Sequence, residues 1–126
     1  MNSYSNIYWK KNKKYYDSLS YDELCNCQWC TLFYSKARQE YPEIADWLAQ
    51  LGIDIGKPFE VMSIDPDESG AVEYIAVQYI AFGTCDTDYN RSIGDVNVRI
   101  TQSYPNPEVE GDYFMLEIGP MQLEKC

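Results

Sequence analysis

Three closely spaced cysteines, Cys25, Cys27 and Cys30, are the residues of this chain whose type and order could do chemistry. Thiolates at such spacing can converge on one soft cation, and a helix N-terminus lowers the pKa of a thiol and so favours the thiolate that a metal needs. A tetrahedral zinc site needs a fourth ligand, which would be Cys85, Cys126, a carboxylate or water, because the chain has no histidine. The cluster therefore indicates a cysteine-ligated metalloprotein as one hypothesis, with zinc ahead of an iron–sulfur centre.

A second interpretation, which the sequence favours, treats the same cysteines as reduced structural thiols. Cys27 and Cys30 fall on the apolar stripe of an expected helix, and free cysteine is among the most buried residue types. This interpretation predicts that both thiols are mostly buried, that no disulfide forms, and that the protein holds no stoichiometric metal or other cofactor. The third interpretation is a thiol oxidoreductase with Cys27 and Cys30 as its dithiol. That motif normally follows a β-strand, and no strand is expected before Cys25.

Two acidic segments resemble parts of calcium-binding loops. Residues 65–70 (DPDESG) match the first six positions of an EF-hand loop, but the twelfth position is Ala76 instead of glutamate, and the flanking segments are expected to be strands. Residues 86–90 (DTDYN) are a weaker match, because Arg91 replaces the required glycine. Hairpin turns favour the same residue types, so both segments are interpreted as turns.

The charge of the chain is strongly acidic, with 10 basic and 20 acidic residues and a net charge of −10. Four lysines, Lys10, Lys11, Lys13 and Lys14, precede every acidic residue, so the rest of the chain carries −14. Such a surface repels phosphate backbones, which argues against a nucleic-acid partner. No segment has the length of a membrane-spanning helix or the apolar core of a signal peptide, so we expect a cytoplasmic protein without a membrane partner.

Histidine is absent, and the five cysteines are an odd number. Without histidine the chain lacks the usual acid–base group for neutral pH and the common nucleophile pairs that depend on it. An enzyme would have to use carboxylates, thiols or tyrosines, so a catalytic function is not favoured. An odd number of cysteines fits the reduced thiols of an unsecreted protein better than a disulfide framework.

Hydrophobic residues with a period of 3.6 predict two helices that follow each other closely. The first covers residues 28–40 and the second residues 42–51. Trp47 and Leu48 of the second helix should be core residues that hold it to the sheet, and Gly52 is well placed to end it.

From residue 57 onward the period changes to two, which predicts strands. The expected strands cover residues 58–64, 71–82, 95–104 and 112–119, with a loop at 83–94. Helices followed by strands indicate a single α+β domain over residues 1–126, with N-terminal helices packed on an antiparallel meander of about four strands. A capping box at residues 20–23 indicates one more helical turn, and residues 1–19 are interpreted as a partly ordered arm.

Several short segments resemble a group of small proteins from Gram-positive bacteria. They are residues 25–30 (CNCQWC), 33–34 (FY), 41–43 (YPE) and 51–60 (LGIDIGKPFE), with a weaker likeness at 73–79. The resemblance covers about half of the chain. Since that group has no assigned activity, the resemblance implies a bacterial cytoplasmic source and no catalytic residues.

The function that the sequence favours is that of a non-catalytic binding or interaction module. Its 12 tyrosines combine an apolar ring with a polar tip, which suits a sheet face or loops that contact a protein or a small molecule. The metalloprotein is the alternative and the thiol oxidoreductase the third hypothesis, while the partner and the oligomeric state stay open.

Overall fold

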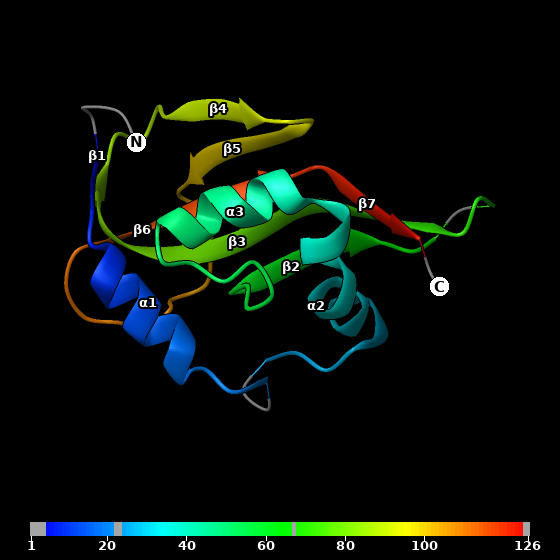
Figure 1. The fold of residues 1–126 in the computed structure, drawn as a ribbon, viewed down its shortest axis with the longest axis horizontal. Coiled ribbons are helices and arrows are strands. Elements are labelled where there is room, and N and C mark those ends of the chain that lie inside the picture. Colours follow the sequence, from blue (N-terminus) through cyan, green and yellow to red (C-terminus); the bar gives the residue numbers. More distant parts are fainter. Residues whose placement is uncertain (1–4, 22–23, 67, 125–126) are drawn as a thin grey trace.

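The computed structural model describes residues 5–21, 24–66 and 68–124, and within them seven strands form one antiparallel sheet (Figure 1). The strands are β1 (Ser5–Ile7), β2 (Glu60–Ile64), β3 (Ala71–Cys85), β4 (Asn90–Ile93), β5 (Val96–Thr101), β6 (Tyr113–Gly119) and β7 (Met121–Glu124). Their order is β1-β3-β6-β5-β4, and β2 and β7 both pair with β3. The mixed helix and strand class and the antiparallel pairing predicted from the sequence are confirmed.

Strand β3, with 15 residues, is the centre of the sheet. Strands β2 and β1 follow each other along one edge of β3, while β6 and β7 follow each other along its opposite edge. Val77 and Gln78 pair with β2 on one side and with β6 on the other. The β-branched and aromatic residues of β3 suit this position, because most of the strand is buried.

Three helices accompany the sheet in the described part of the chain: α1 (Trp9–Ser18), α2 (Gln28–Glu40) and α3 (Pro42–Gln50). The two helices predicted from the sequence are confirmed as α2 and α3. Gly52 follows the end of α3 with a φ of +81°, and a Cβ there would lie 2.3 Å from the backbone oxygen of Trp9, so only glycine fits. None of these three helices is both long enough and apolar enough to cross a membrane.

The larger hydrophobic core lies between the helices and one face of the sheet. Leu48 is fully buried and Trp47 is 9% exposed, so the prediction that both are core residues is confirmed. Phe33 of α2 contacts Tyr74 of β3, with 5.1 Å between the ring centroids. A second, smaller cluster lies on the opposite face of the sheet, since side chains alternate along β3, and it consists of Ile80, Phe82 and Met115.

Residues 5–18, interpreted from the sequence as part of an arm, belong to the fold. Strand β1 pairs with the end of β3, and α1 buries Asn12 and Tyr16. The arm prediction is wrong for these residues, because the inward face of α1 carries an asparagine and a tyrosine in place of the aliphatic residues that reveal a helical period. The capping box predicted at 20–23 includes residues outside the described ones.

The sheet also differs from the predicted meander of about four strands. Strands β1, β4 and β7 have only three or four residues each, which is too short for an alternating pattern to stand out, and β4 lies inside the predicted loop. Strand β6 pairs with β3, and the β4–β5 hairpin extends the sheet beyond it. The helices also do not pack side by side as the single layer on the sheet that the sequence predicted. Helix α1 lies beside β1, away from α2 (Figure 1).

Asn12 is a buried side chain that joins α1 to two other parts of the fold. Its Nδ2 donates to the backbone oxygen of Leu51 at 2.8 Å, and its Oδ1 accepts from the backbone N–H of Phe82 at 2.7 Å. Alanine at this position would leave both backbone groups buried without a partner, at about 1–3 kcal/mol each. We expect Asn12→Ala to lower the free energy of unfolding, measured in urea, by about 2–4 kcal/mol.

The matched control for Asn12 is Asn106, an exposed asparagine whose Oδ1 accepts one hydrogen bond within a turn. Asn106→Ala should cost less than about 1 kcal/mol. Equal losses from the two substitutions would show that Asn12 does not hold α1 to the sheet.

Candidate functional site

Cys27 and Cys30 lie at the start of helix α2. Cys27 is the N-cap residue, and its Sγ accepts a hydrogen bond from the backbone N–H of Cys30 at 3.4 Å. The sulfur thereby satisfies one of the N–H groups that a helix leaves free in its first turn, the role that serine or aspartate usually has. Cys27 is exposed, while Cys30 points inward and is 7% exposed. One thiol of the pair therefore faces solvent and the other faces the protein.

Cys25 joins this pair from the segment that precedes the helix. The Sγ atoms of Cys25, Cys27 and Cys30 all lie within 4.8 Å of one another. Among the described residues no other group of three or more cysteine, aspartate or glutamate side chains converges in this way. The hydroxyl of Tyr34, on the second turn of α2, donates to the backbone oxygen of Cys25 at 2.9 Å and holds the segment against the helix.

Two further hydrogen bonds fix the first turn of α2 to the sheet. The indole Nε1 of Trp29 donates to Oδ1 of Asp65, in the turn that follows β2, at 2.9 Å. The hydroxyl of Tyr74 on β3 donates to the backbone oxygen of Trp29 at 2.6 Å. The three thiols are therefore presented by a helix start that is anchored to two neighbouring strands.

Hydrogen bonding and burial distinguish the two thiols at the helix start. The pKa of the Cys27 thiol is lowered, chiefly by the hydrogen bond from the backbone N–H of Cys30. The pKa of Cys30 is raised, chiefly by burial, and its hydrogen bonds to the other two sulfurs add to this shift. Burial also raises the pKa of Tyr34 and Tyr74, and negative charge on the nearby sulfurs acts in the same direction. Cys27 is thus the member of the pair that more readily becomes a thiolate.

The predicted burial of the cysteines is correct for Cys30 and wrong for Cys27. A residue at the N-cap lies outside the helical repeat, so its position on a helical stripe does not determine which way its side chain points. The two other cysteines considered as a fourth ligand do not join the cluster. Cys85, half-buried, ends β3 at the opposite end of that strand from Tyr74, and Cys126 lies outside the described residues.

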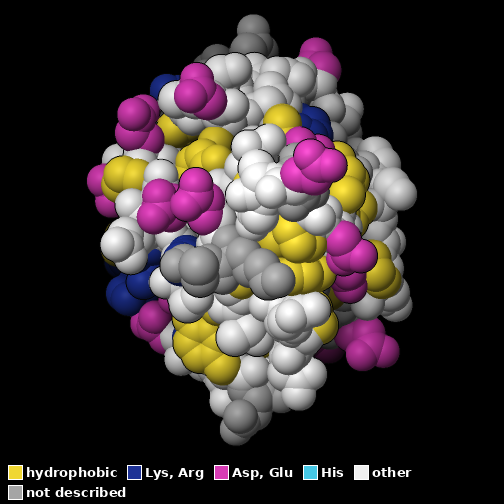
Figure 2. Space-filling model, turned by 90° about the vertical axis from the view of Figure 1, so that its right-hand side faces the viewer, with side chains coloured by type: hydrophobic (Ala, Val, Ile, Leu, Met, Phe, Trp, Pro, Cys, Tyr) yellow, Lys and Arg dark blue, Asp and Glu magenta, His cyan; other side chains and the backbone are white. Residues whose placement is uncertain are grey.

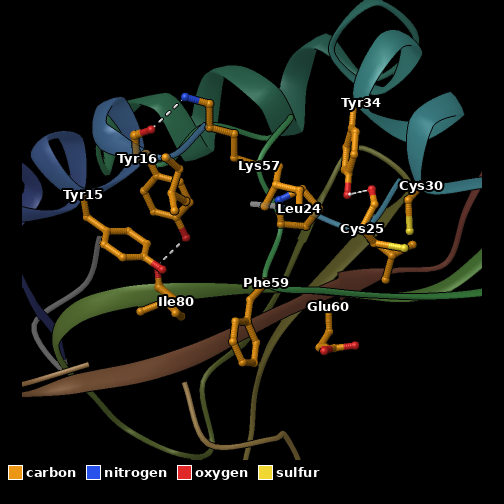
Figure 3. Close-up of a pocket in the computed structure, with 13 residues that line it drawn as sticks. Tyr15, Tyr16, Leu24, Cys25, Cys30, Tyr34, Lys57, Phe59, Glu60 and Ile80 are labelled. Carbon is orange, nitrogen blue, oxygen red and sulfur yellow. Dashed lines mark hydrogen bonds between the residues drawn. The ribbon is translucent and has the colours of Figure 1, made fainter. Parts of the chain in front are cut away.

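A pocket of about 420 Å³ lies next to the cluster, between α1, α2 and the start of β2 (Figure 3). Cys25 and Cys30 lie toward one end of it, while Tyr15 and Tyr16 lie toward the other. Its lining consists of Tyr15, Tyr16, Leu19, Leu24, Cys25, Cys30, Tyr34, Lys57, Pro58, Phe59, Glu60, Val61 and Ile80. No local sequence signal predicts this pocket, because its walls come from segments that meet only through the fold.

The two acidic segments considered for calcium are turns between strands. In the second, the backbone N–H of Tyr89 donates to the backbone oxygen of Asp86 at 3.1 Å. In the first, Asp65 accepts a hydrogen bond from Trp29, Gly70 adopts a φ of +82°, and Asp67 lies outside the described residues. These observations agree with the interpretation as turns.

Acidic side chains are spread over the face of the molecule shown in Figure 2, where few lysine or arginine side chains are visible. This distribution agrees with the composition of the chain, which has 20 acidic and 10 basic residues. A surface of this kind raises the local concentration of cations and lowers that of anions.

In comparisons with known proteins, the chain matches no family model, no curated protein and no solved structure. The resemblance of residues 21–80 to small proteins of Gram-positive bacteria stays a prediction. The function proposed below is supported by the geometry of the cysteine cluster alone.

Proposed function

We propose that the protein binds one soft divalent cation, with zinc as the first candidate, through the thiolates of Cys25, Cys27 and Cys30. The observation that carries this proposal is the distance of at most 4.8 Å between their sulfur atoms. Sulfur ligands around a tetrahedral zinc ion lie about 3.8 Å apart, given a Zn–S distance of about 2.3 Å. A contraction of about 1 Å would therefore bring all three sulfurs into coordination distance.

The position of the cluster at the start of α2 supports the same conclusion. Three thiolates and one divalent cation carry a net charge of −1, which the positive end of a 13-residue helix stabilises. The sequence favours an interaction module that uses its tyrosines, with metal binding as the alternative. Metal binding does not depend on the sheet tyrosines Tyr74 and Tyr79, which are fully buried and cannot form a contact surface.

The proposal is tested by the zinc content of protein that is purified without added metal and dialysed against buffered zinc. We expect about one equivalent per chain, and a loss of most of it when Cys25, Cys27 or Cys30 is replaced by serine. Cys85→Ser is the matched control, because Cys85 is a free thiol outside the cluster, and it should keep the full equivalent. The proposal would be refuted if the unmodified chain contains no zinc, or if Cys85→Ser loses as much zinc as the three cluster variants do.

Tyr34 should position the metal ligands through its hydrogen bond to Cys25. Phenylalanine at this position removes only the hydroxyl that donates to the Cys25 carbonyl. Groups that hold metal ligands in place contribute about 10–100-fold to affinity, so we expect Tyr34→Phe to weaken zinc binding at least about tenfold in competition with a chelator.

The control for this substitution is Tyr41→Phe, which removes a hydroxyl that hydrogen-bonds to the backbone of Gln122 away from the cluster. It should leave the zinc affinity unchanged. If Tyr34→Phe binds zinc as tightly as Tyr41→Phe, the hydroxyl of Tyr34 does not position Cys25.

A second candidate function, a dithiol oxidoreductase, is supported by the contrast between an exposed Cys27 and a buried Cys30. The exposed thiolate would attack a disulfide substrate, and Cys30 would then close a Cys27–Cys30 disulfide and release the substrate as two thiols. Cys25→Ser separates the two functions, because it removes one metal ligand and keeps the dithiol. The oxidoreductase would be favoured if Cys25→Ser reduces a disulfide substrate as fast as the unmodified chain and if neither protein binds zinc. Both functions need reduced thiols, which is consistent with the cytoplasm of a bacterium.

A further inference from the structure

We propose that the pocket beside the cysteine cluster binds a small aromatic thiol, whose sulfur takes the fourth coordination position of the bound cation. This inference rests on the metal binding proposed above and names the ligand class of that site. On binding, the thiol would release its proton to solvent, and its thiolate would displace a water molecule from the cation.

The donor set of the protein is the first argument. A soft cation in tetrahedral coordination needs four ligands, and the cluster supplies three. No carboxylate and no further thiol of the described residues belongs to the group of converging atoms. Within the described part of the chain, the fourth position is therefore open to an external ligand.

The location of the pocket is the second argument. Two of the three cysteines, Cys25 and Cys30, belong to its lining and lie at one end of it, so the cluster borders the pocket (Figure 3). A volume of about 420 Å³ lies within the range of small-molecule sites and has room for a ligand of one or two rings.

The side chains of the pocket walls are the third argument, because they indicate which chemical group the ligand carries besides its sulfur. Four aromatic side chains and five aliphatic ones line the pocket. Three polar groups of the lining are already paired within the protein. The hydroxyl of Tyr16 donates to the backbone oxygen of Ile80, that of Tyr34 donates to Cys25, and Nζ of Lys57 donates to the backbone oxygen of Tyr16. An apolar ring with a single soft donor fits such walls better than a polar molecule.

Among the described residues that line the pocket, Glu60 carries the carboxylate that could take the fourth coordination position instead of an external thiol. It lines the same pocket and is exposed. A shift of its carboxylate toward the cluster would complete the coordination without any external ligand. Glu60→Gln removes the negative oxygen donor and preserves the shape of the side chain, so this variant distinguishes the two arrangements.

The experiment uses the full chain loaded with Co²⁺ under anaerobic conditions. Three probes distinguish the contribution of an aromatic ring to binding from that of a thiol. Thiophenol carries both, phenol has the ring without sulfur, and 2-mercaptoethanol has sulfur without the ring. We expect thiophenol to change the Co²⁺ absorption spectrum and to bind at least about tenfold more tightly than 2-mercaptoethanol, since the pocket buries its ring. Phenol should leave the spectrum unchanged.

Filling the pocket provides a second test. Leu24 is a half-buried lining residue outside the helices and strands, so Leu24→Trp should occupy the space and leave the cysteines in place. We expect it to retain one Co²⁺ per chain and to lose most of the preference for thiophenol over 2-mercaptoethanol. The comparison of probes on the unmodified chain decides the question even if this variant does not fold.

The possible failures are distinguishable. A chain that binds no Co²⁺ would refute the metal site itself, and with it this inference. Stoichiometric Co²⁺ binding without a spectral response to thiophenol would refute the ligand and leave the metal site intact. A Glu60→Gln variant with an altered Co²⁺ spectrum in the absence of any thiol would identify Glu60 as the fourth ligand and would also overturn the inference.

Discussion

Replacing Trp47 by alanine is expected to lower the free energy of unfolding by about 3–5 kcal/mol, the usual cost of removing a buried aromatic side chain. Trp47 is 9% exposed and belongs to the core between α3 and the sheet. The loss combines the apolar surface that is no longer buried with the cavity that remains, because the surrounding side chains relax only partly. Urea unfolding followed by circular dichroism measures this change.

Trp9 is the matched control for Trp47, since the same substitution is made at a side chain that is 51% exposed. Trp9→Ala should cost less than about 1 kcal/mol. A loss below about 1 kcal/mol for Trp47→Ala would show that α3 does not depend on this residue for its attachment to the sheet.

If zinc occupies the proposed site, removing it is expected to have an effect of similar size. A ligand that binds only the folded state stabilises it by about 4 kcal/mol when its free concentration is about 1,000 times the dissociation constant. Chelation of zinc-loaded protein should therefore lower the free energy of unfolding by about that amount, with the first turn of α2 affected most, because Cys27 and Cys30 are part of it.

Two variants make this result specific. Cys27→Ser should unfold at the same urea concentration with and without chelator, because it lacks one ligand. Cys85→Ser should respond to chelator like the unmodified chain. Equal stability of the unmodified chain in zinc and in chelator would contradict the proposed site.

Much of the fold could be predicted because its long elements have regular patterns. Helices α2 and α3 repeat their apolar residues with the helical period, and strand β5 alternates them. Strands β2, β3 and β6 are apolar segments bounded by turn residues. The other elements could not be predicted in the same way. Helix α1 turns Asn12 and Tyr16 inward, and the short strands β1, β4 and β7 depend on pairing with residues that are distant in the sequence.

The candidate site was only partly accessible to sequence analysis. The spacing of the cysteines indicated a metal site as one hypothesis, and the apolar stripe favoured a Cys30 that faces the core, but neither showed that Cys30 also lies close to Cys25. The N-cap position of Cys27 and the tyrosine that holds Cys25 decide this, and both depend on the exact start of α2 and on contacts between side chains. The pocket depends on Tyr15, Cys30 and Val61, which only the tertiary structure brings together.

The absorption spectrum of the Co²⁺-substituted full chain tests the central claim most directly, because thiolate-to-cobalt charge-transfer bands report how many sulfurs ligate the ion. Three thiolate ligands predict that these bands saturate at about one Co²⁺ per chain. Each of Cys25→Ser, Cys27→Ser and Cys30→Ser should reduce their intensity by about a third or abolish binding, while Cys85→Ser has no effect. No charge-transfer band in the unmodified chain, or a band that all three cluster variants retain in full, would contradict the claim that these cysteines hold a metal.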